Sequence, residues 1–264
     1  MPRIALGLEY DGTEFVGWQA QQSGRSIEVT LSGAVQSVAD EPVTVQAAGR
    51  TDAGVHALQQ VVHFDTTATR TVRQWLLGIN SNLPPDVAVR WVKEVPGDFD
   101  ARRSALWRRY RYLILEQPSR PALARRRVWW VRQPLNCAAM TAAALQWLGE
   151  HDFSAFRAAG CQARTPIRTL MAVRISRNVR GEGFLVAVEF TANAFLQHMV
   201  RNLVGMLSEI GRGDLPWAAA ADILASCDRT AAGVTAPANG LTLVEVMYPG
   251  RYSLPAVADD GYPW

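Results

Sequence analysis

Ten residues from Gly49 to Leu58, with the sequence GRTDAGVHAL, constrain the fold of this chain more than any other segment. They follow a strand-like run, residues 43–47, in which branched and polar side chains alternate. Gly49 and Gly54 free the backbone for a tight turn, which holds one side chain clear of a sheet. The segment predicts Asp52 as a candidate nucleophile. The same spacing also fits an Asx-type surface turn with a solvated aspartate.

Length and composition indicate a soluble globular protein. The 264 residues suggest about two domains, since domains usually have about 100 to 200 residues. Apolar residues make up 48% of the chain and charged residues 19%, and uncharged runs fall short of the roughly 18 apolar residues of a membrane span. Residues 1–5 lack the apolar core of a signal peptide. We therefore expect a cytoplasmic protein that does not bind membranes.

The cysteines and histidines carry no metal signature. The three cysteines are an odd number and form no CxxC pair, which argues against a disulfide framework and a structural zinc site. The four histidines include no pair at helical ligand spacing. The sequence thus predicts reduced cysteines and gives no support for a metal.

Residues 102–132 are rich in arginine and aromatic residues, against the single acidic residue Glu116. The arginines are Arg102, Arg103, Arg108, Arg109, Arg111, Arg120, Arg125, Arg126, Arg127 and Arg132, and the aromatic residues are Trp107, Tyr110, Tyr112, Trp129 and Trp130. Guanidinium groups pair with phosphates and aromatic rings stack on unstacked bases, so RNA fits this stretch better than a small acidic substrate does. A solvated basic face is the alternative.

Hydrophobic periodicity predicts an alternation of strands and helices along the whole chain. Strands are expected at residues 4–9, 43–47, 61–65, 87–95, 109–115, 171–178, 184–191 and 241–248, and helices at 26–38, 71–77, 137–149, 194–212 and 217–226. The order of elements restarts near residue 105. This pattern predicts an α+β fold of two similar modules that share a sheet, residues 1–105 and 106–264.

Two further segments carry candidate functional residues. In the strand predicted at 109–115, Tyr110 and Tyr112 point to one face, where they could handle an extruded base or simply bridge core and water. In the helix predicted at 194–212, Gln197, Arg201 and Gly205 share a face, and Gly205 permits a close approach.

Arg201 is a single arginine on a largely apolar helix, so it calls for an anionic partner. Asp52 would be a suitable one, because a neighbouring arginine lowers an aspartate pKa by about 1 to 3 units and keeps the nucleophile ionised.

Ordered motifs along nearly the whole chain resemble the TruA family of tRNA pseudouridine synthases. They are GRTDAGVH at 49–56, YDGT at 10–13, GWQ at 17–19, NLP at 82–84, FDAR at 99–102, RRYRY at 108–112, DF at 152–153, RTP at 164–166, NAF at 193–195, MVRN at 199–202 and GL at 240–241. The chain departs from the family at Glu28, where glutamine is common.

The resemblance implies roles for individual residues. Asp52 would be the catalytic aspartate, Tyr110 the tyrosine that packs on the target base, Arg201 the partner of Asp52, and Leu241 an apolar residue lining the pocket. We add the hypothesis that Arg50, beside Asp52, helps to hold the backbone of the displaced nucleotide.

The resemblance also implies the reaction and the assembly. The family isomerises uridine to pseudouridine at positions 38, 39 and 40 in the anticodon stem-loop of tRNA, without a cofactor or a metal. Its fold consists of two α+β domains around a mixed, mostly antiparallel sheet, and it works as a homodimer.

Three other functions compete with this interpretation. A non-catalytic RNA-binding module explains the arginines but gives no purpose to Asp52, Tyr110 and Arg201. A phosphate-binding NTPase would need a Gly-Lys-Ser/Thr sequence after the glycines, which is missing. An RNA methyltransferase would be the nearest enzymatic alternative, but no GxGxxG opens a helix after a strand.

Overall fold

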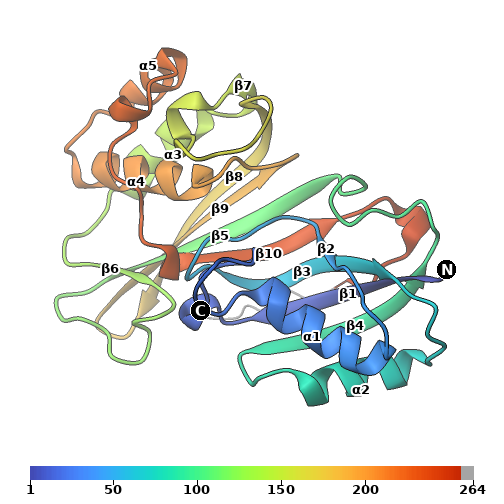
Figure 1. Ribbon diagram of the computed structural model, residues 1–264. Coiled ribbons are helices and arrows are strands. Elements are labelled where there is room, and N and C mark those ends of the chain that lie inside the picture. Colours follow the sequence, from blue (N-terminus) through green and yellow to red (C-terminus); the bar gives the residue numbers. More distant parts are fainter. Residues whose placement is uncertain (257–264) are drawn as a thin grey trace. The chain divides into compact units, whose positions relative to one another are not determined.

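The computed structural model describes residues 1–256, and its packing divides the chain into two compact units (Figure 1). The first unit comprises Met1–Trp107 with the described residues from Thr242 on, and the second comprises Arg108–Leu241. The sequence pattern placed the boundary after residue 105 and assigned the last strand to the second module. In the structure that strand pairs in parallel with a strand of the first unit, a long-range contact that local patterning does not reveal.

The strands of the first unit lie in the order β4 (Val87–Val95), β1 (Arg3–Tyr10), β3 (His56–Asp65) and β10 (Leu241–Met247). The β4–β1 and β1–β3 pairs are antiparallel. The central strands β1 and β3 are buried along most of their length. Helices α1 (Ile27–Ala39) and α2 (Val72–Asn82) lie together beside these strands (Figure 1).

Side-chain caps explain where the two helices begin. Ser26 Oγ accepts a hydrogen bond from Val29 N at the start of α1. Thr71 and Gln74 form a capping box at the start of α2. The predicted end of α2 at residue 77 is wrong, because Gly78 does not stop the helix. A Cβ at Gly78 would lie 2.9 Å from the Val38 side chain, so this glycine allows α1 to pack closely.

The strand predicted at 43–47 is much shorter in the structure. Only β2 (Gln46–Ala47) pairs, with β3. The side chains of Val43 and Val45 are nevertheless buried and those of Thr44 and Gln46 exposed. The alternation of buried and exposed side chains is therefore present, but only residues 46 and 47 of this segment pair with another strand.

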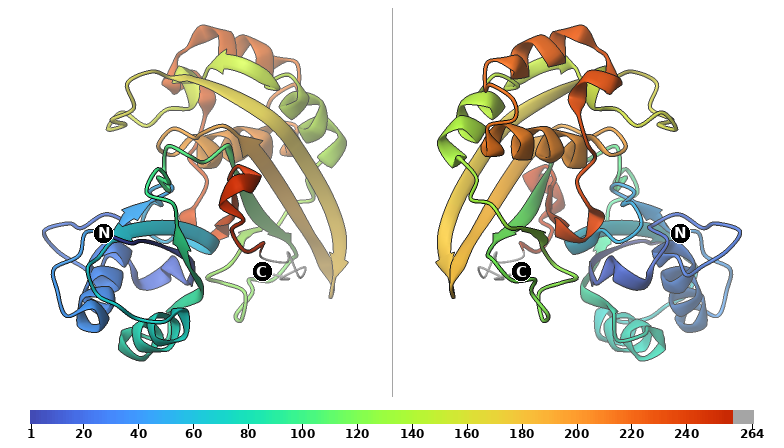
Figure 2. Two further views of the ribbon diagram at one scale, coloured as in Figure 1. Left: turned by 90° about the vertical axis from the view of Figure 1, so that its right-hand side faces the viewer. Right: turned by 90° about the vertical axis from the view of Figure 1, so that its left-hand side faces the viewer.

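The strands of the second unit lie in the order β5 (Trp107–Glu116), β9 (Gly183–Ala192), β8 (Ile167–Arg180) and β7 (Gly149–Asp152). These neighbours pair antiparallel, and the short β6 (Trp129–Val131) pairs in parallel with β5. Helices α3 (Cys137–Leu145) and α4 (Met199–Arg212) pack together on one side of β8 and β9, near α5 (Ala219–Ser226) (Figure 2). The predicted α+β class is confirmed.

Two predicted helices of this unit are too long. The helix predicted at 137–149 ends at Leu145, and Gly149, with φ +102°, starts β7 instead. The helix predicted at 194–212 begins only at Met199, after His198 in the left-handed region. The preceding loop is fixed by the Asn193 side chain, whose Oδ1 accepts hydrogen bonds from Thr169 N and Ala194 N. Within residues 1–256, no helix is long and apolar enough to cross a membrane.

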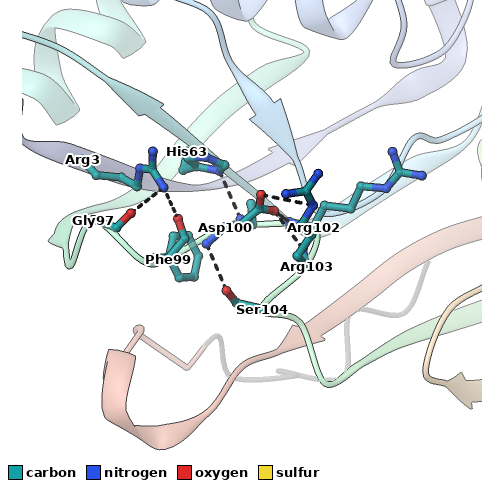
Figure 3. A network of polar contacts seen from close by, with 9 residues as sticks. Arg3, His63, Gly97, Phe99, Asp100, Arg102, Arg103 and Ser104 are labelled. Carbon is teal, nitrogen blue, oxygen red and sulfur yellow. Dashed lines mark hydrogen bonds and ion pairs between the residues drawn. The ribbon is translucent and has the colours of Figure 1, made fainter.

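A polar network fixes the turn that follows β4 (Figure 3). The Arg3 guanidinium forms two 2.7 Å hydrogen bonds with Asp65 and also donates to the carbonyl groups of Gly97 and Phe99. The Asp100 carboxylate accepts hydrogen bonds from the backbone N–H groups of residues 102 and 103, both at 2.8 Å. The turn is therefore held mainly through its backbone.

Buried His63 anchors the same turn. Its Nδ1 accepts a hydrogen bond from Ala101 N at 3.1 Å, which requires this ring nitrogen to be unprotonated. Burial lowers the pKa of His63, the positive charge of Arg3 lowers it further, and Asp100 and Asp65 oppose the shift. His63 is therefore neutral in the folded protein at neutral pH.

This arrangement predicts a loss of stability in mild acid. Below about pH 6.5, the usual histidine pKa, the unfolded chain takes up a proton that folded His63 resists, so the free energy of unfolding should fall with decreasing pH. Urea unfolding at pH 7.5 and 5.5 measures the effect. His63→Gln keeps an acceptor for Ala101 N but does not titrate, so its stability should depend less on pH. An unchanged pH dependence in this variant would contradict the prediction.

Candidate active site

The loop that carries Asp52 leads directly into β3. Asp52 is half-buried and forms an isolated antiparallel bridge with Gly17. Its carbonyl accepts a hydrogen bond from Val55 N at 3.2 Å, and Gly54 adopts φ +77°. The predicted tight turn with glycine in a special conformation is therefore present.

A second segment, residues 12–18, is bound to this loop through backbone hydrogen bonds. Trp18 N donates to Thr51 O at 2.9 Å, and Gly54 N donates to Phe15 O at 3.3 Å. The Asp52 loop is thus held on both sides of the carboxylate.

Two glycines make this contact possible. A Cβ at Gly12 would lie 1.9 Å from Val55 O, and a Cβ at Gly17 would lie 2.8 Å from Thr51 O. Gly17 also has φ +109°, a conformation that disfavours other residues. In the sequence these glycines belong to the family motifs YDGT at 10–13 and GWQ at 17–19. The structure shows that these glycines allow the close contact with the Asp52 loop. Two glycines within one short loop were the sequence feature that could have indicated this contact.

Buried His56 ties the same two segments together. Its Nδ1 accepts a hydrogen bond from Gly12 N at 3.1 Å, and Asp11 Oδ1 lies 3.1 Å from the same nitrogen. Glu28 stands where the family commonly has glutamine. Its Oε2 accepts a hydrogen bond from Ala20 N, so this position still makes a polar contact.

The two candidate residues of this loop differ in exposure. Arg50 is exposed, whereas Asp52 is half-buried. A carboxylate held by its own backbone in this way is suited to nucleophilic attack, because little motion is needed to align it.

The second unit separates the roles of the two tyrosines on β5. Tyr112 is fully buried and donates its hydroxyl to Pro237 O at 2.7 Å, and burial raises its pKa. A Cβ at Gly240 would lie 2.7 Å from the Tyr112 ring. Tyr112 therefore has the structural role. Tyr110 is 9% exposed, and its ring packs edge-on against Phe195, with ring centroids 5.1 Å apart.

Arg201 lies in the first turn of α4, where a chain segment crosses the helix. Arg201 Nε donates to Ala236 O at 2.8 Å, and Ala236 N donates to Arg201 O at 3.1 Å. A Cβ at Gly205 would lie 1.8 Å from Val234 O, so the predicted close approach at Gly205 is confirmed. Gln197 precedes the helix, and its predicted place on the same helical face is wrong.

Leu241 is buried and is the first residue of β10, directly after the short 3-10 turn Ala238–Gly240. Sequence periodicity alone offered no reason to select it. Among residues 1–256, no three His, Cys, Asp or Glu side chains are grouped closely enough to hold a metal ion.

The arginine-rich stretch does not form one uniform solvated face. Arg108 is buried and donates to Asn193 O at 2.7 Å, and Arg111 pairs with Glu189 at 2.7 Å. Six others are exposed: Arg102, Arg103, Arg120, Arg125, Arg126 and Arg132. Residue type alone could not separate arginines that hold strand β5 in place from those at the surface.

Comparison with known proteins defines the class. A family model described as tRNA pseudouridine synthase matches residues 8–102 and 143–249. The chain belongs to the TruA family of tRNA pseudouridine synthases, isomerases that act on uridine in tRNA.

Curated relatives narrow this to one kind of enzyme. The tRNA pseudouridine synthase A of Enterobacter sp. (strain 638) is 52% identical over 253 residues, which cover 96% of this chain and 92% of the relative. The protein of that name from Klebsiella pneumoniae (strain ATCC 700721 / MGH 78578) is 52% identical over 255 residues, covering 97% and 93%. A solved archaeal box H/ACA sRNP Nop10–Cbf5 complex shows a weak likeness, with 13% identity, a TM-score of 0.33, and coverage of 78% of this chain and 42% of that one.

The glycine contact predicts that Gly17→Ala disrupts the Asp52 loop. The new Cβ would meet Thr51 O and require an unfavourable φ, so unfolding should become easier by more than about 1 kcal/mol, with a large loss of activity. Gly33→Ala in α1 is the matched control, because a Cβ there has no neighbour within 4 Å. It should leave activity unchanged. Thermal unfolding and activity assays of both variants measure this, and a fully active Gly17→Ala would refute it.

Proposed function

We propose that this enzyme converts uridine to pseudouridine at positions 38, 39 and 40 of the tRNA anticodon stem-loop, with Asp52 as nucleophile and without a cofactor. The fixed backbone around Asp52 is the observation that carries the nucleophile assignment, since the Thr51 carbonyl before it and the Gly54 N–H after it are bonded to Trp18 and Phe15. The similarity to enzymes named tRNA pseudouridine synthase A supports the substrate.

The proposed reaction exchanges one glycosidic bond for another. The Asp52 carboxylate attacks C1′ of the ribose or stabilises positive character there while the N1–C1′ bond breaks. The detached uracil turns, and C5 bonds to C1′ as any Asp52–C1′ bond breaks and releases the free carboxylate. The hydrogen on C5 then leaves as a proton, and N1 gains a proton. The target lies in a stem, so it must first be flipped out of its stack.

Tyr110 and Leu241 are the proposed contacts of the base. The Tyr110 ring packs on the uracil face and keeps the base in place while it turns, and Phe195 supports that ring from its edge. Leu241 contributes an apolar wall. Both assignments come from the family resemblance.

Arg201 is the proposed partner of Asp52, again from the family resemblance. A guanidinium has five N–H donors, and the Ala236 carbonyl accepts from the one on Nε. The proposed ion pair uses donors on the terminal nitrogens. Its role is to keep Asp52 ionised and oriented rather than to stabilise the fold.

Exposed arginines are the proposed contacts of the RNA backbone. Arg50 lies two residues before Asp52 and would hold the backbone of the flipped nucleotide. The exposed members of the 102–132 stretch would bind flanking phosphates. We further propose that the enzyme acts in the cytoplasm as a homodimer, as the family does.

Tritium release tests the reaction and the nucleophile together. Purified protein without any cofactor should release tritium to water from tRNA labelled at C5 of uridine, because bonding at C5 expels that hydrogen. Asp52→Asn should bind the same tRNA, but its rate of tritium release should be lower by a factor of at least about a thousand, since it lacks the nucleophile. Tight binding with no release by the wild type would instead indicate a binding module.

The salt dependence of tRNA binding tests the arginine assignment. Arg103 has 89% of its side chain exposed and lies 4.0 Å from the Asp100 carboxylate, a distant contact that leaves its charge accessible to phosphate. Arg103→Gln should weaken binding and lower the slope of log K against log salt by about one. Arg212→Gln is the control, because that guanidinium pairs with Asp214 at 2.7 Å. Equal slopes for wild type and Arg103→Gln would remove Arg103 from the RNA contact.

A further inference from the structure

Three polar side chains are buried beneath the loop that carries Asp52. Tyr10 comes from the end of β1, Thr51 from the loop itself and Gln60 from β3. Gln60 is 0% exposed. Buried polar groups of this kind cost free energy unless they are well paired, so their presence calls for an explanation.

The three side chains hold the backbone on both sides of Arg50. Gln60 Nε2 donates to Gly49 O at 2.6 Å and lies 3.5 Å from Tyr10 Oη. Tyr10 Oη lies 2.8 Å from Thr51 Oγ1. Thr51 O in turn accepts a hydrogen bond from Trp18 N. Residues 49–51 are therefore fixed by the side chains of Gln60 and Tyr10 and by one backbone hydrogen bond.

Tyr10 links the other two side chains. Its hydroxyl oxygen accepts a hydrogen bond from the Gln60 amide nitrogen, which can only donate, and it shares a second hydrogen bond with Thr51 Oγ1 in which either hydroxyl can be the donor. Burial raises the pKa of Tyr10 to about 12, which keeps the hydroxyl protonated at physiological pH. The Tyr10 hydroxyl therefore takes part in both contacts as a neutral group.

Stability alone is a poor reason for this network. Gln60 Oε1 is buried without a hydrogen-bond partner, a cost that an apolar side chain of similar size would avoid. The amide is retained although half of its polar capacity is unused. What it provides is a fixed position for the Gly49 carbonyl, three residues before Asp52.

We propose that Tyr10, Thr51 and Gln60 are positioning residues for the isomerisation. By fixing the backbone of residues 49–51, they set the position and orientation of the Asp52 carboxylate. The inference rests on the proposed role of Asp52. A displacement of about 1 Å at a reacting group can cost about 100-fold in rate. Loss of the network should therefore slow the chemical step far more than it weakens tRNA binding.

Single-turnover kinetics with saturating enzyme test this inference. Tyr10→Phe and Thr51→Val each delete one hydroxyl with little change in shape, and each should lower the rate constant by about 10- to 100-fold with an unchanged Kd for tRNA. Thr51→Ser keeps the hydroxyl and should stay near the wild-type rate. The double variant should be little slower than either single variant, because both remove the same bond.

Tyr248→Phe is the matched control. Tyr248 also donates a buried hydroxyl, to Ala101 O at 2.6 Å, in the turn after β4 that His63 anchors. Its rate constant should match the wild type. If Tyr10→Phe slows the reaction only as much as Tyr248→Phe, or only in proportion to the unfolded fraction, the positioning role is refuted.

Asp52→Asn separates failure of this inference from failure of the proposed function. An inactive Asp52→Asn beside fully active Tyr10→Phe and Thr51→Val would overturn the positioning role alone. An active Asp52→Asn would overturn the proposed nucleophile and, with it, the purpose assigned to the network.

Discussion

The close contact between residues 12–18 and the Asp52 loop is the constraint on which the proposed active site depends. Two backbones meet there at distances that leave no room for a Cβ at Gly12 or Gly17. Hydrogen bonds from Trp18 and to Phe15 then fix the loop on both sides. Two buried side chains add further hydrogen bonds: His56 accepts one from Gly12 N, and Gln60 donates one to Gly49 O. Asp52 is held by main-chain geometry first and by side chains second.

The sequence predicted the elements better than their ends. The strand predicted at residues 87–95 matches β4, because prolines stand on both sides of it in the sequence. Helix α2, by contrast, continues through Gly78, where Val38 of α1 packs against it. Strand β7 was missed because its four residues are partly exposed and lack an apolar alternation. The left-handed His198 that delays α4 follows Gln197, whose carbonyl accepts a hydrogen bond from Ala158 N, a contact that local sequence does not reveal.

For the candidate site, residue types indicated the chemistry and the structure separated the roles. Tyr110 and Tyr112 were equivalent by alternation, but the Tyr112 hydroxyl is bound to the Pro237 carbonyl, whereas the Tyr110 ring packs edge-on against Phe195. Arg108 and Arg111 belong to the arginine-rich stretch predicted to bind RNA, and the structure shows that they link β5 to Glu189 of β9 and to Asn193 just after it. The Tyr10–Thr51–Gln60 network joins three separate segments, so no local pattern could have revealed it.

The anchoring of the Asp52 loop also determines which partner must change shape. Thr51 O and Gly54 N are both bonded to one neighbouring segment, so the loop has little slack with which to follow a nucleotide. If Asp52 is the nucleophile, as proposed, the conformational work of forming the complex would fall on the RNA, which would have to unstack and extrude its uridine. Stems with weak local pairing should then be the easier substrates, and the enzyme would sense RNA deformability as well as sequence.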